Sequence, residues 1–266
     1  MIETETMMRP GVFLSEKTWK LMLSGQFFIL IGSPGTVNYL RSIGVDVFDD
    51  IIGYTEQDLM SDHSFWGKHQ HFIQSNAERG YGYWLWKPYI IMKVMDLLEY
   101  GDFLVYADAG CTINSNGGQR FQEYQSMLNS NPFGLLAYQL YACNDIEYIK
   151  RATLEYIGAT EHDKNTPLII TTALVIKKTN KSMEFIKRWY EFASMYDLIN
   201  DDSHQENEYP EFKDHRHDQA IFSLLVKQEI RKDSQNGPIV IGDETYFPND
   251  WHGQGGSYPF WGTRHR

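Results

Sequence analysis

The sequence predicts an α/β fold with a Rossmann-like central sheet, mixed but mostly parallel, flanked by helices. Its length of 266 residues suits one large α/β domain. Near-continuous apolar runs at 103–107 and 168–176 are typical of buried central strands. An amphipathic helical pattern at 86–98 directly precedes the first of these runs, and helix followed by buried strand is the α/β signature.

The other elements follow from periodicity along the chain. The apolar run 26–32 predicts a buried strand, and a short helix and a strand or turn are expected at 36–43 and 45–52. A polar helical stretch follows, and then further helices alternate with one more strand (55–76 helical, 119–129 helix, 134–141 strand, 181–196 helix, 200–214 acidic loop, 218–229 helix). Without repeats or low-complexity linkers, residues 1–266 are interpreted as one domain, with 1–47 a remodelled first βα unit.

The charge balance excludes several classes of protein. With 24 Lys and Arg against 35 Asp and Glu, the net charge is −11. This composition argues against a nucleic-acid binder, which usually carries a basic stripe, and against docking on anionic lipid. An acidic enzyme binds an anionic substrate through a local cationic pocket or a metal ion. The composition therefore favours a metal-assisted site.

Cysteine usage and the N-terminus bear on the compartment. Cys111 and Cys143 have no metal-ligand spacing, and a pair of reduced, buried thiols is favoured over a single disulfide. The polar N-terminus lacks the apolar core of a signal peptide, and the sequence contains no apolar run of 18 residues. These features predict a cytoplasmic protein without a membrane span, in the host cytoplasm if the protein is viral.

A carboxylate directly follows the central strand at 103–107. In open α/β sheets, ligands collect outside the carboxyl ends of strands. Asp108, within Tyr106-Ala107-Asp108-Ala109-Gly110-Cys111, is therefore placed to hold a hard cation and, through it, a diphosphate. The alternative is that Asp108 only caps a turn.

A segment rich in glycine and aromatic residues precedes that strand, with the sequence RGYGYWLWKPY at 79–89. Its glycines allow close backbone approach to a ligand, and Arg79 and Lys87 are cations that suit phosphate oxygens. Tyr83 and Trp86 are candidates for stacking on a base or sugar. The alternative is a buried aromatic cluster beneath a helix start.

Two histidine-containing segments lie in the C-terminal half. His215-Arg216-His217-Asp218-Gln219 opens an apolar helix, and Asp218 is a candidate general base or acceptor anchor, with His217 beside it. The alternative for Asp218 is a helix N-cap. His252 is a candidate metal ligand from the tail, against the alternative of an exposed tail histidine.

Taken together, these three motifs resemble a family of GT-A glycosyltransferases found in large DNA viruses, phages and some bacteria, including the chlorella-virus capsid glycosyltransferases. The resemblance covers roughly 48–266. It implies a GT-A fold, a nucleotide-diphosphate-sugar donor and a Mn²⁺ or Mg²⁺ ion, with a glycan or glycoprotein as the acceptor. The transferred group would be a hexose or deoxyhexose.

The resemblance also assigns residues to roles. Asp108 takes the Asp-x-Asp position, together with Tyr106 and Ala107 on the donor side. Gly110 stands where the second acidic residue is common, so either His217, Asp218 or His252 completes the metal site, or metal binding is weak. A C-terminal histidine takes that role in some GT-A enzymes, which favours His252. The alternatives are a nucleotide-sugar-binding module and a sugar-nucleotide hydrolase.

Overall fold

The computed structural model describes residues 28–30, 51–108, 111–202, 205–245 and 254–262. Its central element is a four-stranded sheet in the order β3-β6-β5-β7, formed by β3 (Phe103–Ala107), β6 (Pro167–Lys177), β5 (Leu135–Asn144) and β7 (Ile239–Ile241). Two further strands, β1 (Phe28–Leu30) and β2 (Ile51–Gly53), pair in parallel, and β1 lies beside β3. Apart from β1, residues 1–47 lie outside the described residues.

The fold is α/β, but the four-stranded sheet is not mostly parallel. β6 runs antiparallel to both β3 and β5, and β5 pairs in parallel with β7. The sequence pattern misled because a strand covered on both faces reads as a continuous apolar run whatever its direction. Since β3, β5 and β7 run the same way, their carboxyl ends meet at one edge of the sheet.

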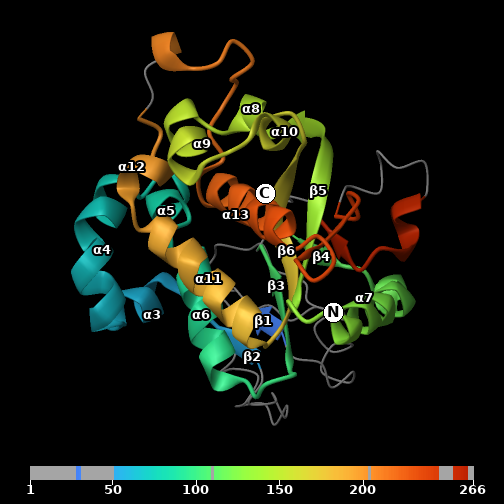
Figure 1. Cartoon of the computed structure of the whole chain (residues 1–266). Coiled ribbons are helices and arrows are strands. Elements are labelled where there is room, and N and C mark those ends of the chain that lie inside the picture. Colours follow the sequence, from blue (N-terminus) through green and yellow to red (C-terminus); the bar gives the residue numbers. More distant parts are fainter. Residues whose placement is uncertain (1–27, 31–50, 109–110, 203–204, 246–253, 263–266) are drawn as a thin grey trace.

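Helices cover both faces of the sheet (Figure 1). On one face α11 (Asn180–Ala193) packs against both α6 (Trp86–Leu97) and α13 (His217–Lys232), and α13 packs against β6. The other face packs against α7 (Gly118–Ser130) and a small antiparallel pair, β4 (Thr112–Ile113) and β8 (Phe260–Trp261). The helices predicted at 119–129, 181–196 and 218–229 are confirmed within a few residues.

Shorter elements surround this body. The stretch predicted as helical at 55–76 divides into two helices because Asp62 ends the first and caps the second. Residues 145–164, for which the sequence analysis gave no helix, form three short ones. The remaining elements are α3 (Glu56–Ser61), α4 (His63–Ser75), α5 (Gly80–Tyr83), η1 (Ser115–Gly117), α8 (Asp145–Tyr148), α9 (Arg151–Ile157), α10 (Glu161–Lys164), α12 (Tyr196–Ile199), η2 (Gln205–Asn207) and η4 (Gln254–Ser257).

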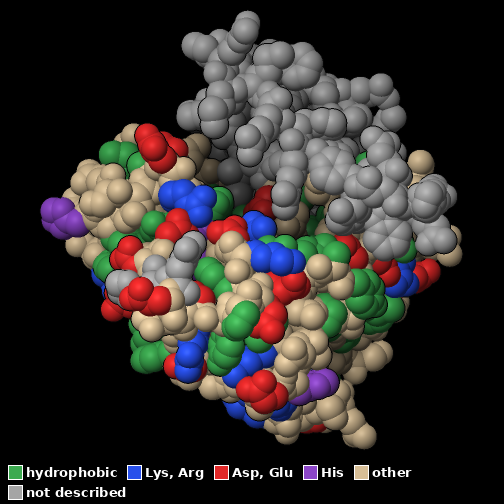
Figure 2. All heavy atoms as spheres, turned by 90° about the horizontal axis from the view of Figure 1, so that it is seen from above, with side chains coloured by type: hydrophobic (Ala, Val, Ile, Leu, Met, Phe, Trp, Pro, Cys, Tyr) green, Lys and Arg blue, Asp and Glu red, His purple; other side chains and the backbone are tan. Residues whose placement is uncertain are grey.

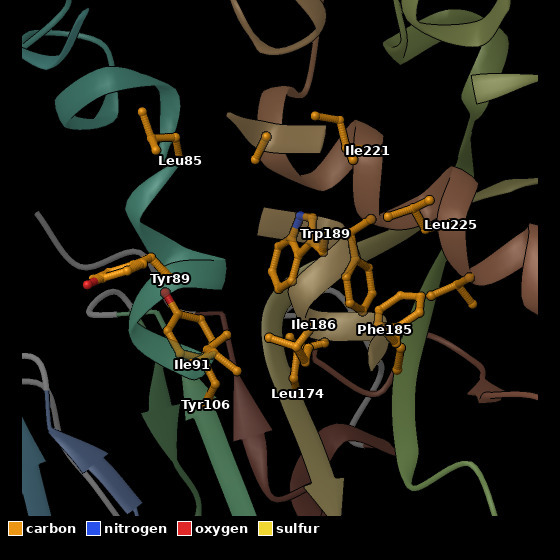
Figure 3. Packing of buried hydrophobic residues seen from close by; sticks show 14 of the residues in the cluster. Leu85, Tyr89, Ile91, Tyr106, Leu174, Phe185, Ile186, Trp189, Ile221 and Leu225 are labelled. Carbon is orange, nitrogen blue, oxygen red and sulfur yellow. The ribbon is translucent and has the colours of Figure 1, made fainter. Parts of the chain in front are cut away.

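The main core lies between the sheet and α6, α11 and α13. Trp189 and Phe222 are fully buried, with ring centroids 4.7 Å apart. Figure 3 shows Phe185, Trp189 and Leu225 gathered where α11 meets α13. Burying aromatic side chains of this size contributes several kcal/mol of hydrophobic stabilisation, on the order of 1.5–3 kcal/mol for each. This packing fixes α6 and α13, which carry the candidate site.

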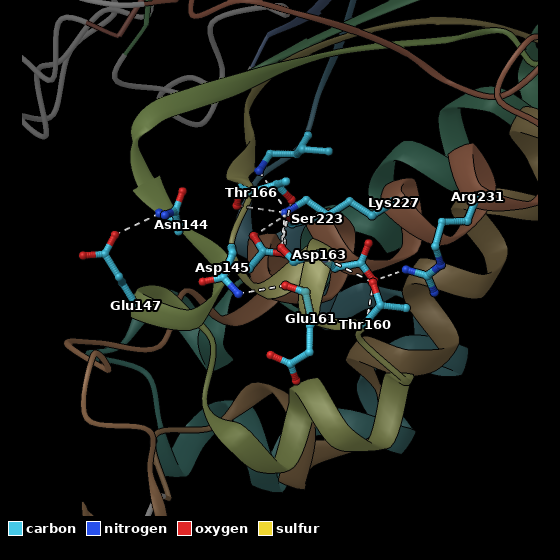
Figure 4. A network of polar contacts seen from close by, with 12 residues as sticks. Asn144, Asp145, Glu147, Thr160, Glu161, Asp163, Thr166, Ser223, Lys227 and Arg231 are labelled. Atoms are coloured by element: carbon cyan, nitrogen blue, oxygen red, sulfur yellow. Dashed lines mark hydrogen bonds and ion pairs between the residues drawn. The ribbon is translucent and has the colours of Figure 1, made fainter.

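A buried polar network lies away from the N-terminal ends of α6 and α13 (Figure 4). Lys227 Nζ lies 2.8 Å from Asp145 Oδ2 and also donates to the backbone oxygens of Asp163 and Thr166. Ser223 Oγ donates to Asp145 Oδ1 at 2.9 Å. This network ties α8 and α10 to α13.

The distribution of charged side chains on the surface and the polarity of the helices are consistent with the composition. Figure 2 shows one face of the molecule, and over its described part Lys and Arg side chains are interspersed with Asp and Glu. Within the described ranges, every helix is too short or too polar to cross a membrane.

Candidate functional site

Lys87 lies at the centre of a buried charged cluster. It is the second residue of α6 and is 3% exposed. Its Nζ is 3.1 Å from Asp108 Oδ1 and 3.4 Å from Asp218 Oδ2, and it donates to Thr171 Oγ1 at 3.1 Å. Asp108, Thr171 and Asp218 come from three separate segments of the sequence and meet at the Lys87 ammonium group.

Asp108 is the open member of this cluster. Its backbone N–H donates to Thr172 O at 2.8 Å, which continues the β3–β6 pairing one residue past the strand. Its Oδ1 accepts a 2.8 Å hydrogen bond from Tyr106, whose side chain is fully buried. The Asp108 side chain is 35% exposed, so part of the carboxylate faces solvent. Ala107 is buried in the sheet opposite Ala173.

Asp218 is the buried member, and its carboxylate is not an N-cap. Arg216 is the N-cap residue of α13 and makes no side-chain capping bond. Instead Asp218 Oδ2 accepts a 3.2 Å bond from Thr171 Oγ1 and faces Lys87. Its backbone oxygen accepts a 2.9 Å bond from Trp189 Nε1, which anchors the first turn. The capping alternative therefore does not explain this carboxylate.

The protonation states follow from burial and charge. Burial raises the pKa of Asp218 to about 6, even though Lys87 opposes the shift, and Asp108 adds to it. Burial lowers the pKa of Lys87, but Asp108 and Asp218 outweigh it and raise that pKa overall. Lys87 therefore stays an ammonium, and Asp218 titrates near neutral pH. A carboxylate with that pKa is suited to general base catalysis.

The glycine- and aromatic-rich segment forms a left-handed turn. Residues 80–84 all have positive φ, including Tyr81 at 54°, Tyr83 at 56° and Trp84 at 59°. Left-handed conformations cost about 1–2 kcal/mol for each non-glycine residue. A Cβ on Gly80 would lie 2.3 Å from the Trp84 ring, and one on Gly82 would lie 2.8 Å from a side-chain atom of α4. Both glycines are therefore required by close contacts as well as by φ.

Arg79 and its partners form a second cluster beside the first. Arg79 Nε donates to Asp201 Oδ2 at 2.8 Å, and Arg79 Nη2 lies 3.3 Å from His217 Nε2. The Arg79 side chain is 49% exposed, so its guanidinium is accessible to a ligand. Trp84 stacks on the His217 ring with a centroid distance of 5.5 Å, and Tyr83 packs on the same ring at 4.9 Å.

His217 uses both ring nitrogens in this arrangement. Its Nδ1 lies 2.9 Å from Ile199 O, so Nδ1 carries the proton, and Nε2 accepts from Arg79. Burial lowers the pKa of His217 and favours this neutral form. The first histidine of the motif is placed in the same way, because His215 Nε2 lies 2.9 Å from Leu198 O. The next backbone carbonyl along the chain, Asn200 O, accepts a 2.9 Å hydrogen bond from Lys150 Nζ.

The structure thus gathers most of the residues that the sequence singled out. Lys87, Tyr106, Asp108 and Asp218 meet directly, and Arg79, Tyr83 and His217 adjoin them. Trp86 lies at the left-handed turn, where its Nε1 donates to Gly80 O at 2.9 Å. His252 lies outside the described residues.

Sequence reasoning missed Thr171, Asp201 and the hydroxyl of Tyr106. The signal for Thr171 is present: two adjacent threonines interrupt the apolar run of β6. A polar residue in a buried strand needs a hydrogen-bond partner, and here the partners are Lys87 and Asp218. Asp201 carries no comparable signal because it belongs to an acidic loop.

The described part of the site offers few ligands for a divalent cation. Across the described ranges, no group of three or more His, Cys, Asp or Glu side chains is placed to hold a metal ion. Asp108 contributes one carboxylate that is partly open to solvent. Mg²⁺ is commonly held by one or two carboxylates together with substrate phosphates and water. The residues present therefore fit a cation that arrives with a diphosphate, and do not form a preformed protein cage.

The comparisons with known proteins place the chain in no family. No protein-family model matches the sequence, and no curated protein matches it. Among solved structures, the crystal structure of mouse xyloside xylosyltransferase 1 in its apo form is similar to this chain. The identity is 8% and the TM-score is 0.46, over 88% of this chain and 82% of that one.

Proposed function

We propose that this chain is a metal-assisted glycosyltransferase that moves a sugar from a UDP- or GDP-sugar to a glycan or glycoprotein acceptor. One observation carries the proposal: the three motifs that resemble GT-A enzymes converge on the Lys87 ammonium, at the carboxyl edge of the sheet. A hexosyl or deoxyhexosyl donor, the viral or phage subfamily and a cytoplasmic location belong to the same proposal and rest on the motifs alone.

The cluster supplies what transfer to a hydroxyl requires. An acceptor hydroxyl is a poor nucleophile near neutral pH, and an inverting enzyme needs a base within hydrogen-bond reach of it. Asp218, with a pKa of about 6, is ionised enough at pH 7 to accept that proton. Arg79, oriented through Nε by Asp201 and through Nη2 by His217, presents Nη1 for a donor phosphate.

The charge balance supports a divalent cation. Asp108 and Asp218 contribute two negative charges against the single positive charge of Lys87, so the ionised cluster has a net charge of −1. A diphosphate would be repelled by this cluster unless a cation accompanied it. We propose that Asp108 holds such an ion, with His252 as a further ligand. When bound, the ion would stabilise the charge that develops on the leaving diphosphate.

A second candidate function is hydrolysis of a nucleotide-sugar without an acceptor. The observation that favours it is the burial of Asp218, whose side chain is 4% exposed. A water molecule reaches such a carboxylate more readily than the hydroxyl of a bulky glycan does. A nucleotide-sugar-binding module without turnover would need the same donor contacts and no base.

Incubation with Mn²⁺ and a panel of UDP-, GDP- and dTDP-sugars, with and without acceptor glycans, separates these functions. We expect acceptor-dependent release of nucleotide that is abolished by chelation and by Asp108→Asn. Asp96→Asn is the matched control, because Asp96 is exposed on α6, the helix that carries Lys87. If Asp108→Asn turns over the donor normally with the metal chelated, the metal role of Asp108 is wrong.

A further inference from the structure

The carboxyl edge of the sheet extends beyond the Lys87 cluster. Asp108 donates to Thr172 O through its backbone, and a Cβ on Gly262 would lie 3.8 Å from Thr172 Cγ2. Gly262 N in turn donates to Thr245 O at 2.7 Å. These contacts bring a residue that follows β7 close to Thr172, the backbone partner of Asp108.

An aromatic ring is exposed at the end of β5 on this edge. The pairing of β5 with β6 is interrupted after Leu140, because the next partner on β5 is Asn144 and three residues lie between. Bulges of this kind redirect side chains and are common beside active sites. Tyr141, the first of the three, is 62% exposed, and its hydroxyl would lie 3.2 Å from a Cβ on Gly242. The ring therefore lies against the glycine backbone and leaves much of its surface open.

A buried carboxylate follows that glycine. Asp243 is 6% exposed, and its carboxylate interacts with Thr245, both with the backbone N–H and, at 3.5 Å, with Oγ1. The adjacent Glu244 differs, because Arg120 pairs with it at 2.6 Å. Burial raises the pKa of Asp243, and no cation contributes to that shift. The contacts with Thr245 use two of the roughly four acceptor positions of a carboxylate.

We propose that Tyr141 and Asp243 form a subsite for the acceptor saccharide. The ring stacks on the apolar face of a pyranose, and the carboxylate accepts hydrogen bonds from its hydroxyl groups. An exposed aromatic ring, together with a carboxylate one residue past the glycine that the ring contacts, matches the two chemistries of a sugar, apolar C–H faces and donor hydroxyls. Asp108 and Tyr141 both lie toward the carboxyl ends of the strands, with Asp108 level with Thr172 and Tyr141 beyond Leu168, so the acceptor would extend along this edge from the donor site. This inference rests on the proposed function.

The test measures transfer to p-nitrophenyl glycosides of xylose, glucose, galactose and mannose, and measures donor hydrolysis separately. With Tyr141→Ala we expect the KM for the preferred glycoside to rise roughly 3- to 10-fold, in line with the strength of aromatic stacking contacts, with unchanged donor hydrolysis. Tyr141→Phe keeps the ring and should resemble the wild type. Tyr156→Ala is the matched control, because Tyr156 is also 62% exposed and lies on α9. Asp243→Asn should raise the same KM.

The outcomes separate this inference from the proposed function. Equal effects of Tyr141→Ala and Tyr156→Ala, or no effect of either, overturn the subsite. The subsite is also overturned if the wild type hydrolyses the donor but neither transfers the sugar to any glycoside nor binds one. In that case the proposed use of the donor stands. If no donor is turned over, the proposed function fails, and saturation-transfer NMR with the same glycosides decides the subsite through loss of signal in Tyr141→Ala.

Discussion

Lys87→Met removes the ammonium between Asp108 and Asp218 and keeps a side chain of similar length. With a pKa of about 6, ionised Asp218 is favoured at pH 7 by about 1.4 kcal/mol, one pKa unit at 1.36 kcal/mol. Lys87 lowers that pKa, so without it we expect the pKa to rise further and Asp218 to take up a proton at a higher pH. Protonation limits the loss of stability to about 1–3 kcal/mol, the cost of a lost buried hydrogen bond, instead of the roughly 3–5 kcal/mol of a stranded buried charge.

The assay is the dependence of donor turnover on pH between 5 and 9. The wild-type rate should rise through about pH 6 and then level off, because Asp218 must be ionised to accept a proton. In Lys87→Met this rise should move to higher pH, and turnover at pH 7 should fall about twofold for a shift of one unit and about tenfold for a shift of two. A Lys87→Met profile identical to that of the wild type would refute the reasoning. A loss of donor affinity alone would instead assign Lys87 to the donor phosphates.

The matched control is Lys227→Met. Lys227 is also a buried lysine that pairs with a carboxylate, Asp145, but it lies toward the opposite end of α13 from Asp218. Its replacement should lower Tm by several degrees, because a buried pair is broken, without moving the pH profile of turnover. A shift of the profile in both variants would mean that loss of stability, and not local charge, controls the titration.

Three further variants test the remaining parts of the site. Asp218→Asn should lower turnover on the order of 10²-fold or more with little change in Tm, and near-normal turnover would exclude Asp218 as the base. Arg79→Ala should weaken donor binding by about 1.5–3 kcal/mol in a titration, with unchanged Tm because the side chain is half exposed. Gly80→Ala should lower stability by about 1–3 kcal/mol in a denaturant melt, since its φ is +60° and the Cβ meets the Trp84 ring. Gly67→Ala, with open space around it on α4, is the control for Gly80→Ala, and equal stability of the two variants would contradict this account.

The sequence predicted the elements whose signal is local and strong. The apolar runs at 103–107 and 168–176 correspond to β3 and β6. Strand direction could not be predicted, because burial on both faces gives the same pattern for either direction. The helices at 145–164 were missed because they are four to seven residues long and depend on tertiary contacts, such as the Lys227 network, more than on periodicity.

The candidate site was predictable in its members but not in its geometry. Cations, carboxylates and histidines in unusual motifs mark Lys87, Asp108 and Asp218. The fold brings the two carboxylates within 3.4 Å of the Lys87 ammonium group. What the sequence could not show is that Asp218 is buried, which raises its pKa. Nor could it show that His217 binds a helix carbonyl, because that contact depends on where α12 ends.

The left-handed turn explains why the first and third motifs occur together. On an α-helix, Arg79 and Lys87 would be about 12 Å apart along the axis. The turn instead leaves them on either side of the dipeptide His217-Asp218, where Arg79 meets the imidazole and Lys87 meets the carboxylate. Three non-glycine residues at positive φ cost about 3–6 kcal/mol in total, which packing elsewhere must offset. A right-handed helix would avoid that cost and separate the two cations, so the strain is best explained by the positions that it gives them.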